Sequence, residues 1–324
     1  AEATASLLKL FSGIIVDRTQ HSKPWIIFGY GLAGLGRPLI AFISSWPWLL
    51  LIRFTDRIGK GLRSSPRDAL LANSVDAGQR GLAFGFHRAM DNAGSVLGPL
   101  LAFTLLSFQV ELQQIFLYAA FPALICLALT FAIPESKPST PAQPVQRFDW
   151  RLSRQPALFK RYLLVVALFT LGNSSNMFLL LRARELGVSA AEIPLLWAMV
   201  SAVAMLFATP LSAWSDRLGR TQLLFAGYLA YALFYAGLAT MIEDRGLLFA
   251  WFGFYGLFMA ATEGVEKALV ADLAPGHLRG TAFGWFNLVA GLMLLPASLI
   301  FGSLYQSVSP TLAFAFSASC ALLS

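Results

Sequence analysis

The chain has 324 residues, of which 57% are hydrophobic and only 13% are charged, with a formal net charge of +7. Soluble domains carry about 25% charged residues, so this composition excludes an ordinary soluble globular protein as well as a disordered chain. Two cysteines, Cys126 and Cys320, are too few for a disulfide framework. The basic residues alternate from loop to loop between apolar segments, which indicates a membrane protein and not a nucleic-acid-binding one.

Apolar segments of membrane-spanning length follow one another along the chain. A spanning helix needs about 20 apolar residues, and the fold class we expect is therefore an all-α membrane protein. The expected spans are 24–45, 48–72, 81–106, 114–133, 161–181, 193–213, 221–241, 247–271 and 280–303, with partial spans at 1–16 and 310–324.

The loops between these spans separate into two sets by charge. The poorer set carries only Arg182, Arg184 and Arg245. By the positive-inside rule the richer set is cytoplasmic, and it includes the longest loop, 134–160, which is polar and rich in proline. We expect this loop to link an N-terminal bundle at 1–133 to a C-terminal bundle at 161–324. The richer set carries Arg18, Lys23, Arg80, Lys137, Arg147, Arg151, Arg154, Lys160, Arg161, Arg217, Arg220 and Arg279.

An internal repeat relates the two halves at a constant offset of 199 residues. One offset kept across several loops on the same membrane side indicates parallel halves, related by an axis along the membrane normal. The span at 161–181 has no earlier partner, so we expect the first helix and part of the second to be missing, and the last helix to stop short, in a protein of six plus six spans. The offset aligns Asp17-Arg18 with Asp216-Arg217, Ala69-Leu70 with Ala268-Leu269, and Arg80-Gly81 with Arg279-Gly280.

Several motifs resemble those of the major facilitator superfamily. SAWSDRLGR at 212–220 is similar to the signature loop between the second and third helices of each half, and SGIIVDRTQHSK at 12–23 is similar to its first-half copy, which departs from the pattern at Thr19, Gln20 and His21. RFTDRIGKGLRSSPRDALLA at 53–72 resembles the fourth-helix arginine element. AGSVLGPLLAF at 93–103 resembles an antiporter element through Gly94, Gly98 and Pro99, but departs from it at Leu100 and Leu101.

The resemblance implies two pseudo-twofold-related six-helix transmembrane bundles, here incomplete at both ends, in a multi-pass protein of the bacterial inner (cytoplasmic) membrane. It also implies a cytoplasmic gate in which each loop aspartate contacts a neighbouring helix start and arginines. A solvated turn would show the same residues. The gate residues are Asp17, Arg18, Asp216, Arg217 and Arg220.

The helix expected at 48–72 carries ionisable side chains at three- or four-residue steps, which places them on one face. One interpretation is a cationic face that lines the central cavity and attracts anionic groups, and the other is ion pairing within one bundle. Ser65-Pro66-x-Asp68 also predicts that a helix restarts there. Arg53 and Arg57 are the cavity candidates, Asp56 is a coupling candidate, Lys60 continues the face, and Arg63 and Arg67 suit a gate or the interface.

His87, Arg88 and Asp91 share one face of the helix at 81–106. Their repeat partners are Phe286, Asn287 and Ala290, so the shared scaffold does not require this charged cluster. We take His87 and Arg88 as substrate or cavity candidates and Asp91 as a proton-coupling candidate. A structural salt bridge within the first bundle is the alternative.

Glu263 and Glu266 lie three residues apart on the helix at 247–271, with Lys267 beside them. A carboxyl group in a low-dielectric, intermittently wetted helix can act as a proton-coupling site. Glu263 is the first choice, and a structural pair is the alternative for Glu266. Asn173 and Asn176 at mid-span are candidates for substrate contact or for bonding between helices.

The sequence shows no phosphate-binding loop, no convergent nucleophile set and no obvious metal site, so we expect no enzyme activity, no cofactor and no metal. The expected function is secondary active transport by alternating access, with proton-coupled export of a small amphipathic compound. Uptake or exchange of an anionic solute, such as an organic acid or a metal chelate, is one alternative, and a non-transporting membrane sensor is another. The expected partners are a small-molecule substrate, protons and the lipid bilayer, with no nucleic acid, and the protein is expected to be a monomer.

Overall fold

The computed structural model describes residues 2–43, 45–134, 151–240 and 244–324, and every regular element in these ranges is a helix. Eight helical stretches in the described ranges are long and apolar enough to cross a membrane. The span expected at 48–72 is not among them, because the helix there carries too many charged residues to qualify by composition. The helices are α1 (Glu2–Thr19), α2 (Lys23–Leu39), α3 (Trp46–Asn73), α4 (Arg80–Ser107), α5 (Leu112–Tyr118), α6 (Ala120–Ala132), α7 (Ala157–Gly172), α8 (Asn176–Glu185), α9 (Ile193–Leu218), α10 (Arg220–Ala239), α11 (Arg245–Leu273), α12 (Arg279–Ser307) and α13 (Pro310–Leu323).

The span expected at 161–181 lies within the apolar stretch Ala157–Glu185, but it consists of two helices, α7 and α8, with a break at 173–175. The Ser175 side chain accepts a hydrogen bond from the backbone N–H of Met177 and so caps the start of α8. A short polar Gly-Asn-Ser-Ser run favours such a cap over a continuous helix.

The helix restart expected at Ser65-Pro66 is wrong, because α3 continues without interruption through Pro66. A proline inside a helix removes one backbone hydrogen bond. Ser65 and Pro66 are buried, as is Ala69 in the next turn, so packing holds the helix together across the missing bond.

Contacts divide the chain into two compact units, each described by itself. Unit 1 comprises Ala1–Ser74, Gly98–Pro156 and Leu273–Gly291, and unit 2 comprises Val75–Leu97, Ala157–Asp272 and Leu292–Ser324. Each unit therefore contains the first part of a long helix from the other half of the sequence: α12 in unit 1 and α4 in unit 2. The bundles predicted at 1–133 and 161–324 stay a prediction.

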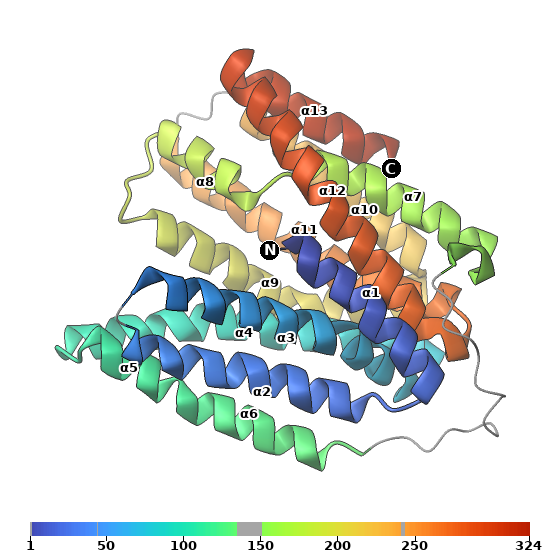
Figure 1. Ribbon diagram of the computed structural model, residues 1–324. Coiled ribbons are helices and arrows are strands. Elements are labelled where there is room, and N and C mark those ends of the chain that lie inside the picture. The colour runs from blue at the N-terminus through green and yellow to red at the C-terminus, as the bar shows by residue number, and fades with distance from the viewer. Residues whose placement is uncertain (1, 44, 135–150, 241–243) are drawn as a thin grey trace. The chain divides into compact units, whose positions relative to one another are not determined.

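In unit 1, α3 packs against both α1 and α2, and α2 also packs against α6 (Figure 1). Gly29 of α2 and Gly59 of α3 meet backbone to backbone, since a Cβ added at Gly59 would lie 2.7 Å from the Gly29 carbonyl oxygen. Gly61, two residues further along α3, packs against Leu8 of α1 in the same close manner. Small residues permit these close helix crossings in a membrane.

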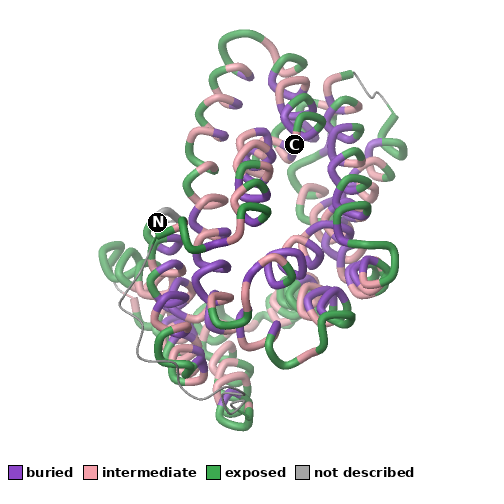
Figure 2. The backbone as a smooth tube through the Cα atoms, turned by 90° about the vertical axis from the view of Figure 1, so that its right-hand side faces the viewer, coloured by how far each residue is buried: buried purple, intermediate pink, exposed green. Residues whose placement is uncertain are grey.

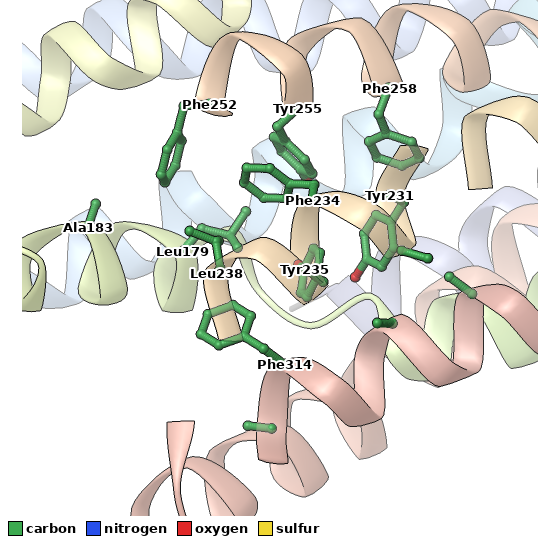
Figure 3. Packing of buried hydrophobic residues seen from close by; sticks show 14 of the residues in the cluster. Leu179, Ala183, Tyr231, Phe234, Tyr235, Leu238, Phe252, Tyr255, Phe258 and Phe314 are labelled. Carbon is green, nitrogen blue, oxygen red and sulfur yellow. The ribbon is translucent and has the colours of Figure 1, made fainter. Parts of the chain in front are cut away.

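Unit 2 has a largely aromatic core to which every helix from α7 to α13 contributes. Figure 3 shows its members from α8, α10, α11 and α13. Phe169 stacks on Tyr228 with ring centroids 4.1 Å apart, and Tyr231 stacks on Tyr235 at the same distance. Stacked aromatic pairs add about 0.5–1.5 kcal/mol beyond the area they bury. This core fixes the positions of α10 and of α11, the helix that carries Glu263 and Glu266.

Long stretches of these helices alternate between buried and exposed residues, as Figure 2 shows by colour. Many exposed residues are large and apolar, and Phe103 and Phe225 are 71% and 72% exposed. In water an apolar surface of this kind would be unfavourable, whereas in a bilayer it contacts acyl chains. The polar groups of such helices must therefore lie on other faces.

Candidate functional site

Asp216, near the end of α9, binds the start of α4 within unit 2. Its two carboxylate oxygens accept hydrogen bonds from the backbone N–H groups of Gly81 and Leu82, each at 2.9 Å. The first N–H groups of a helix have no partner inside the helix and carry a partial positive charge, so they bind a carboxylate well.

Asp17, near the end of α1, makes the same contact with the start of α12 within unit 1. Its oxygens accept hydrogen bonds from the N–H groups of Gly280 at 2.7 Å and Thr281 at 2.6 Å. Every residue of this contact stands 199 positions from its equivalent in the other, so the repeat read from the sequence recurs in the structure. The contact with a helix start is the one that the resemblance implies, and its gating role stays a prediction.

The arginine that begins each of these helices adds a second repeated contact. Arg80 donates to the Ala271 carbonyl at 3.3 Å and to Asp272 at 2.5 Å. Arg279 donates to the Ala72 carbonyl at 3.5 Å and to the side-chain oxygen of Asn73. We call the two sets of contacts the Asp17 clamp (Asp17, Asn73, Arg279, Gly280 and Thr281) and the Asp216 clamp (Gly81, Leu82, Arg80, Asp216, Arg220 and Asp272).

The two clamps differ in charge. Arg220 pairs with Asp216 at 2.5 Å and with Asp272 at 3.0 Å, and the side chains of Arg220 and Asp216 are 9% and 8% exposed. The repeat places His21 at the position of Arg220 and Asn73 at that of Asp272. Within the described parts of the chain no basic nitrogen lies within 4.0 Å of the Asp17 carboxylate.

This difference changes the electrostatics of Asp17. Removal of its carboxyl group from water raises the pKa of Asp17 from 3.8 to about 7, although the hydrogen bonds from Thr281 and Gly280 act in the opposite direction. Both loops contain a residue with positive φ at the equivalent position, Gln20 with φ 58° and Gly219 with φ 103°. The remaining gate candidates, Arg18 and Arg217, are exposed.

Close backbone packing accompanies both clamps. A Cβ added at Gly280 would collide with the Gly13 carbonyl oxygen, and one added at Gly81 would collide with the Ser212 carbonyl oxygen. Positions 13 and 212 are again 199 residues apart. The helix start can therefore reach the carboxylate only because it carries glycine at this position.

A cluster of charged side chains joins α4 to α11 within unit 2. Arg88 lies 3.6 Å from Glu263 and 3.7 Å from Asp91, and His87 lies 3.7 Å from Asp91. The Glu263 side chain is 30% exposed and that of Asp91 is 49% exposed. The structure thus brings together four residues that the sequence analysis selected from two distant helices.

Glu266 lies one turn further along α11 and has its own partners. The Tyr228 hydroxyl donates to its carboxylate at 3.1 Å, and the Tyr162 hydroxyl contacts its backbone carbonyl at 3.5 Å. Sequence reasoning missed both tyrosines. Their apolar surroundings looked like ordinary core, and nothing in the sequence links either residue to Glu266.

The two asparagines have different surroundings from those expected. Asn176 begins α8, and its side-chain oxygen accepts a hydrogen bond from the Tyr255 hydroxyl of α11 at 3.1 Å. Asn173 lies in the break between α7 and α8, not on a helical face. For Asn176 the observed contact is the bond between helices, which was the alternative to substrate contact.

The basic residues of α3 divide into two kinds. Arg63 donates to the Gly29 carbonyl at 3.2 Å and stacks over the Tyr30 ring at 4.4 Å. Arg67 pairs with Asp68 at 3.1 Å. Arg63 and Arg67 thus have partners within unit 1. The contacts of Arg53 and Lys60 are considered below.

The antiporter-like element lies on an open face of α4. Gly94, Gly98 and Pro99 are exposed, and a Cβ added at either glycine would meet nothing within 4 Å among the described residues. Across those residues no group of three His, Cys, Asp or Glu side chains could hold a metal ion.

Comparisons with known proteins identify the family. The family model for the Major Facilitator Superfamily matches residues 2–182 and 162–324. An uncharacterised MFS-type transporter of Methanocaldococcus jannaschii is 33% identical over 330 residues, covering 100% of this chain and 82% of that protein. Multidrug resistance protein MdtH of Sodalis glossinidius is 27% identical over 290 residues, covering 87% and 69%.

Solved structures agree on the fold. The human organic anion transporter MFSD10 (TETRAN) matches with a TM-score of 0.79 at 17% identity, covering 99% of this chain and 81% of that one. The proton:xylose symporter XylE matches with a TM-score of 0.77 at 16% identity, covering 99% and 82%. The chain has the all-helical, two-domain fold of these transporters, and it belongs to the major facilitator superfamily.

Proposed function

We propose that this transporter exports a small amphipathic compound in exchange for protons, by alternating access in the bacterial inner membrane. Membership in a transporter family supports transport, and the 27% identity to Multidrug resistance protein MdtH supports export. Proton coupling depends on the ionisable residues of α4 and α11.

The observation that carries the coupling proposal is the contact of Arg88 with Glu263. Both residues lie within helical stretches long enough to span the membrane. An ionised group in such a helix must face protein or water, and Arg88 also approaches Asp91, so one cation is shared by two carboxylates. Protonation of either carboxylate would release Arg88 to the other, which links proton binding to a rearrangement between α4 and α11.

In this mechanism Glu263 and Asp91 exchange the proton, and His87 and Arg88 supply the positive partners. Glu266 is held by Tyr228 and serves as a second acceptor on the same helix. Asp56 on α3 is a further proton acceptor, in unit 1. Substrate contact is assigned to Arg53, Arg57, His87, Arg88, Asn173 and Asn176.

Purified full-length protein in proteoliposomes tests the proposal. An imposed pH gradient should drive accumulation of amphipathic fluorescent dyes, and dye movement should carry protons in the opposite direction. Glu263→Gln and Asp91→Asn should each abolish the response to the gradient. Arg245→Gln, at the start of α11 with a side chain 63% exposed, should leave it intact.

Three results would contradict the proposal. Protons that move in the same direction as substrate would indicate uptake, and an unchanged response in both carboxylate variants at every pH would remove Glu263 and Asp91 from the coupling mechanism. Absence of any dye or proton movement in the wild-type protein would favour a non-transporting sensor.

A further inference from the structure

The basic side chains of α3 form a stripe that the shared scaffold does not require. We define the α3 stripe as Arg53, Arg57, Lys60 and Arg67. At the offset of 199 the equivalent positions of α11 hold Phe252, Gly256, Met259 and Glu266, none of them basic. Because α3 and α11 occupy equivalent places in the repeat, the positive charge is a feature of this one helix.

The two helices that pack on α3 leave the stripe on another face. Gly59 contacts α2 and Gly61 contacts α1, and Lys60 lies between them in sequence. Successive residues of an α-helix are about 100° apart around its axis, so Lys60 points about 100° away from each contact. Arg53, two turns earlier, shares that direction, while the buried Leu62 lies on the opposite side.

The stripe crosses the middle of the helix. Lys60 is at the centre of α3, which spans Trp46–Asn73 and is about 42 Å long at 1.5 Å per residue. Arg53 lies about 10 Å from Lys60 along the axis. By composition alone α3 is too charged to count among the candidate membrane spans. Within a membrane protein its ionised side chains must therefore face protein or an aqueous path, because acyl chains cannot solvate them.

Two members of the stripe have no acidic partner among the described residues of unit 1. Ion pairs engage Arg67 with Asp68, but no carboxylate oxygen lies within 4.0 Å of the basic nitrogens of Arg53 or Lys60. Asp56 lies on the same face, one turn from each of them, but it forms no ion pair with either within 4.0 Å. Two cations near the middle of one helix face, neither held in an ion pair, are an arrangement that can bind an anionic ligand.

We propose that the transported compound carries an anionic group, a carboxylate, sulfonate or phosphate, that binds between Arg53 and Lys60. The inference rests on the proposed function, since it names the chemical class of the substrate of the same transporter. The anionic group would bind to α3 in unit 1, and proton exchange would take place on α4 and α11.

A matched pair of probes tests this inference. 8-Anilinonaphthalene-1-sulfonate and N-phenyl-1-naphthylamine share one aromatic skeleton and differ by the sulfonate. Binding of each to the full-length protein in nanodiscs is measured by fluorescence, with empty nanodiscs subtracted. Wild-type protein should bind the sulfonate more tightly than the neutral probe.

Substitutions in the α3 stripe test whether Arg53 and Lys60 cause the preference for the sulfonate probe. Arg53→Gln and Lys60→Gln should each weaken sulfonate binding about tenfold, which is the usual effect of removing one charge-assisted hydrogen bond, and should change binding of the neutral probe less than twofold. Arg53→Lys should restore most of the affinity, and the control Arg245→Gln should change neither probe. The single substitutions are made separately, so that a folding defect in one leaves the other informative.

Equal affinity of the wild-type protein for the two probes, no binding of the sulfonate, or an anion preference that survives both substitutions would overturn the inference. The dye-export assay is independent of these results. If the substitutions abolish the anion preference but the wild-type protein shows no proton-driven dye movement, the anion site is supported and the proposed transport mode is contradicted. If the wild-type protein exports dye but the substitutions leave the anion preference unchanged, only the anion site is contradicted.

Discussion

Asp17 and Asp216 bind the same atoms of two equivalent helix starts, but only Asp216 has an arginine partner. Each carboxylate accepts two backbone hydrogen bonds, at 2.6–2.9 Å, and the 2.5 Å contact with Arg220 is present in the Asp216 clamp alone. The repeat therefore conserves the geometry of the clamp and changes its charge. The two clamps should differ in strength and in their response to pH.

Substitution of either aspartate by alanine should destabilise the protein, and Asp216→Ala should do so more. Asp17→Ala leaves two N–H groups without an acceptor, at a cost of about 1–3 kcal/mol. Asp216→Ala also removes one of the two carboxylates that pair with buried Arg220, so the loss should be larger than for Asp17→Ala although Asp272 remains as a partner. Melting temperatures in detergent compare the two. Equal losses, or a larger loss for Asp17→Ala, would contradict the charge difference between the clamps.

Acidification should favour the closed Asp17 clamp. The pKa of Asp17 is about 7 in the clamp and 3.8 for an exposed aspartate. A group whose pKa is raised in one state stabilises that state when it is protonated, so the stabilisation is complete below about pH 4 and is lost as the pH rises through 7. A cysteine placed at Val16, which is 5% exposed, reports opening through its alkylation rate, corrected for the thiolate fraction.

The corrected alkylation rate should increase between pH 5 and pH 8 in the wild-type protein and should be flat in the Asp17→Ala background. A rate that falls over this interval would reverse the predicted sign. Arg279 is the charged group at the same helix start, but its guanidinium is bonded to Asn73 and Ala72.

Introduction of the missing arginine should remove this pH dependence. His21 occupies the position equivalent to Arg220, and its ring nitrogen contacts the Thr19 carbonyl. In His21→Arg the guanidinium can pair with Asp17, which lowers the pKa of that carboxyl group. The alkylation rate should then be low and constant over the same pH range. His21→Gln, which adds no charge, is the matched control and should behave like the wild-type protein.

Gly280→Ala should weaken the Asp17 clamp without adding or removing charge. The new methyl group would meet the Gly13 carbonyl, which is backbone and cannot move out of the way as a flexible side chain could. Overpacking of this kind costs about 1–3 kcal/mol. Gly276→Ala is the control, because a Cβ there meets nothing within 4 Å among the described residues. Equal melting temperatures for both variants would show that the approach of α12 to α1 is not tight.

The positions of these residues could be predicted from the sequence to different degrees. The offset of 199 paired Asp17 with Asp216 and Arg80 with Arg279 correctly, because a duplicated loop keeps its spacing. The break at 173–175 was missed, although Gly172 and Ser175 are residues that end and cap helices. An apolar run on both sides of the break concealed it.

Contacts between helices that are distant in the sequence could not be predicted from the sequence. The charges of Arg88 and Glu263 singled them out as candidates, but their 3.6 Å approach depends on how α4 packs on α11. Pro66 illustrates the opposite error, since a local rule predicted a helix restart that tertiary packing overrides. The contact of Tyr228 with Glu266 could not be predicted, because a tyrosine in an apolar helix is expected to be a core residue unless its hydroxyl partner is known.

The Tyr228 contact with Glu266 should be a stabilising hydrogen bond, not a coincidence of packing. Tyr228→Phe removes the hydroxyl donor and keeps the ring that stacks on Phe169, so its effect isolates the bond. Loss of a hydrogen bond inside a protein costs about 0.5–1.5 kcal/mol. Because Glu266→Gln replaces the carboxyl group that accepts this bond, Tyr228→Phe should cost less in that background than in the wild-type protein. Melting temperatures of the four proteins form a double-mutant cycle, and additive losses would mean that the two side chains do not interact.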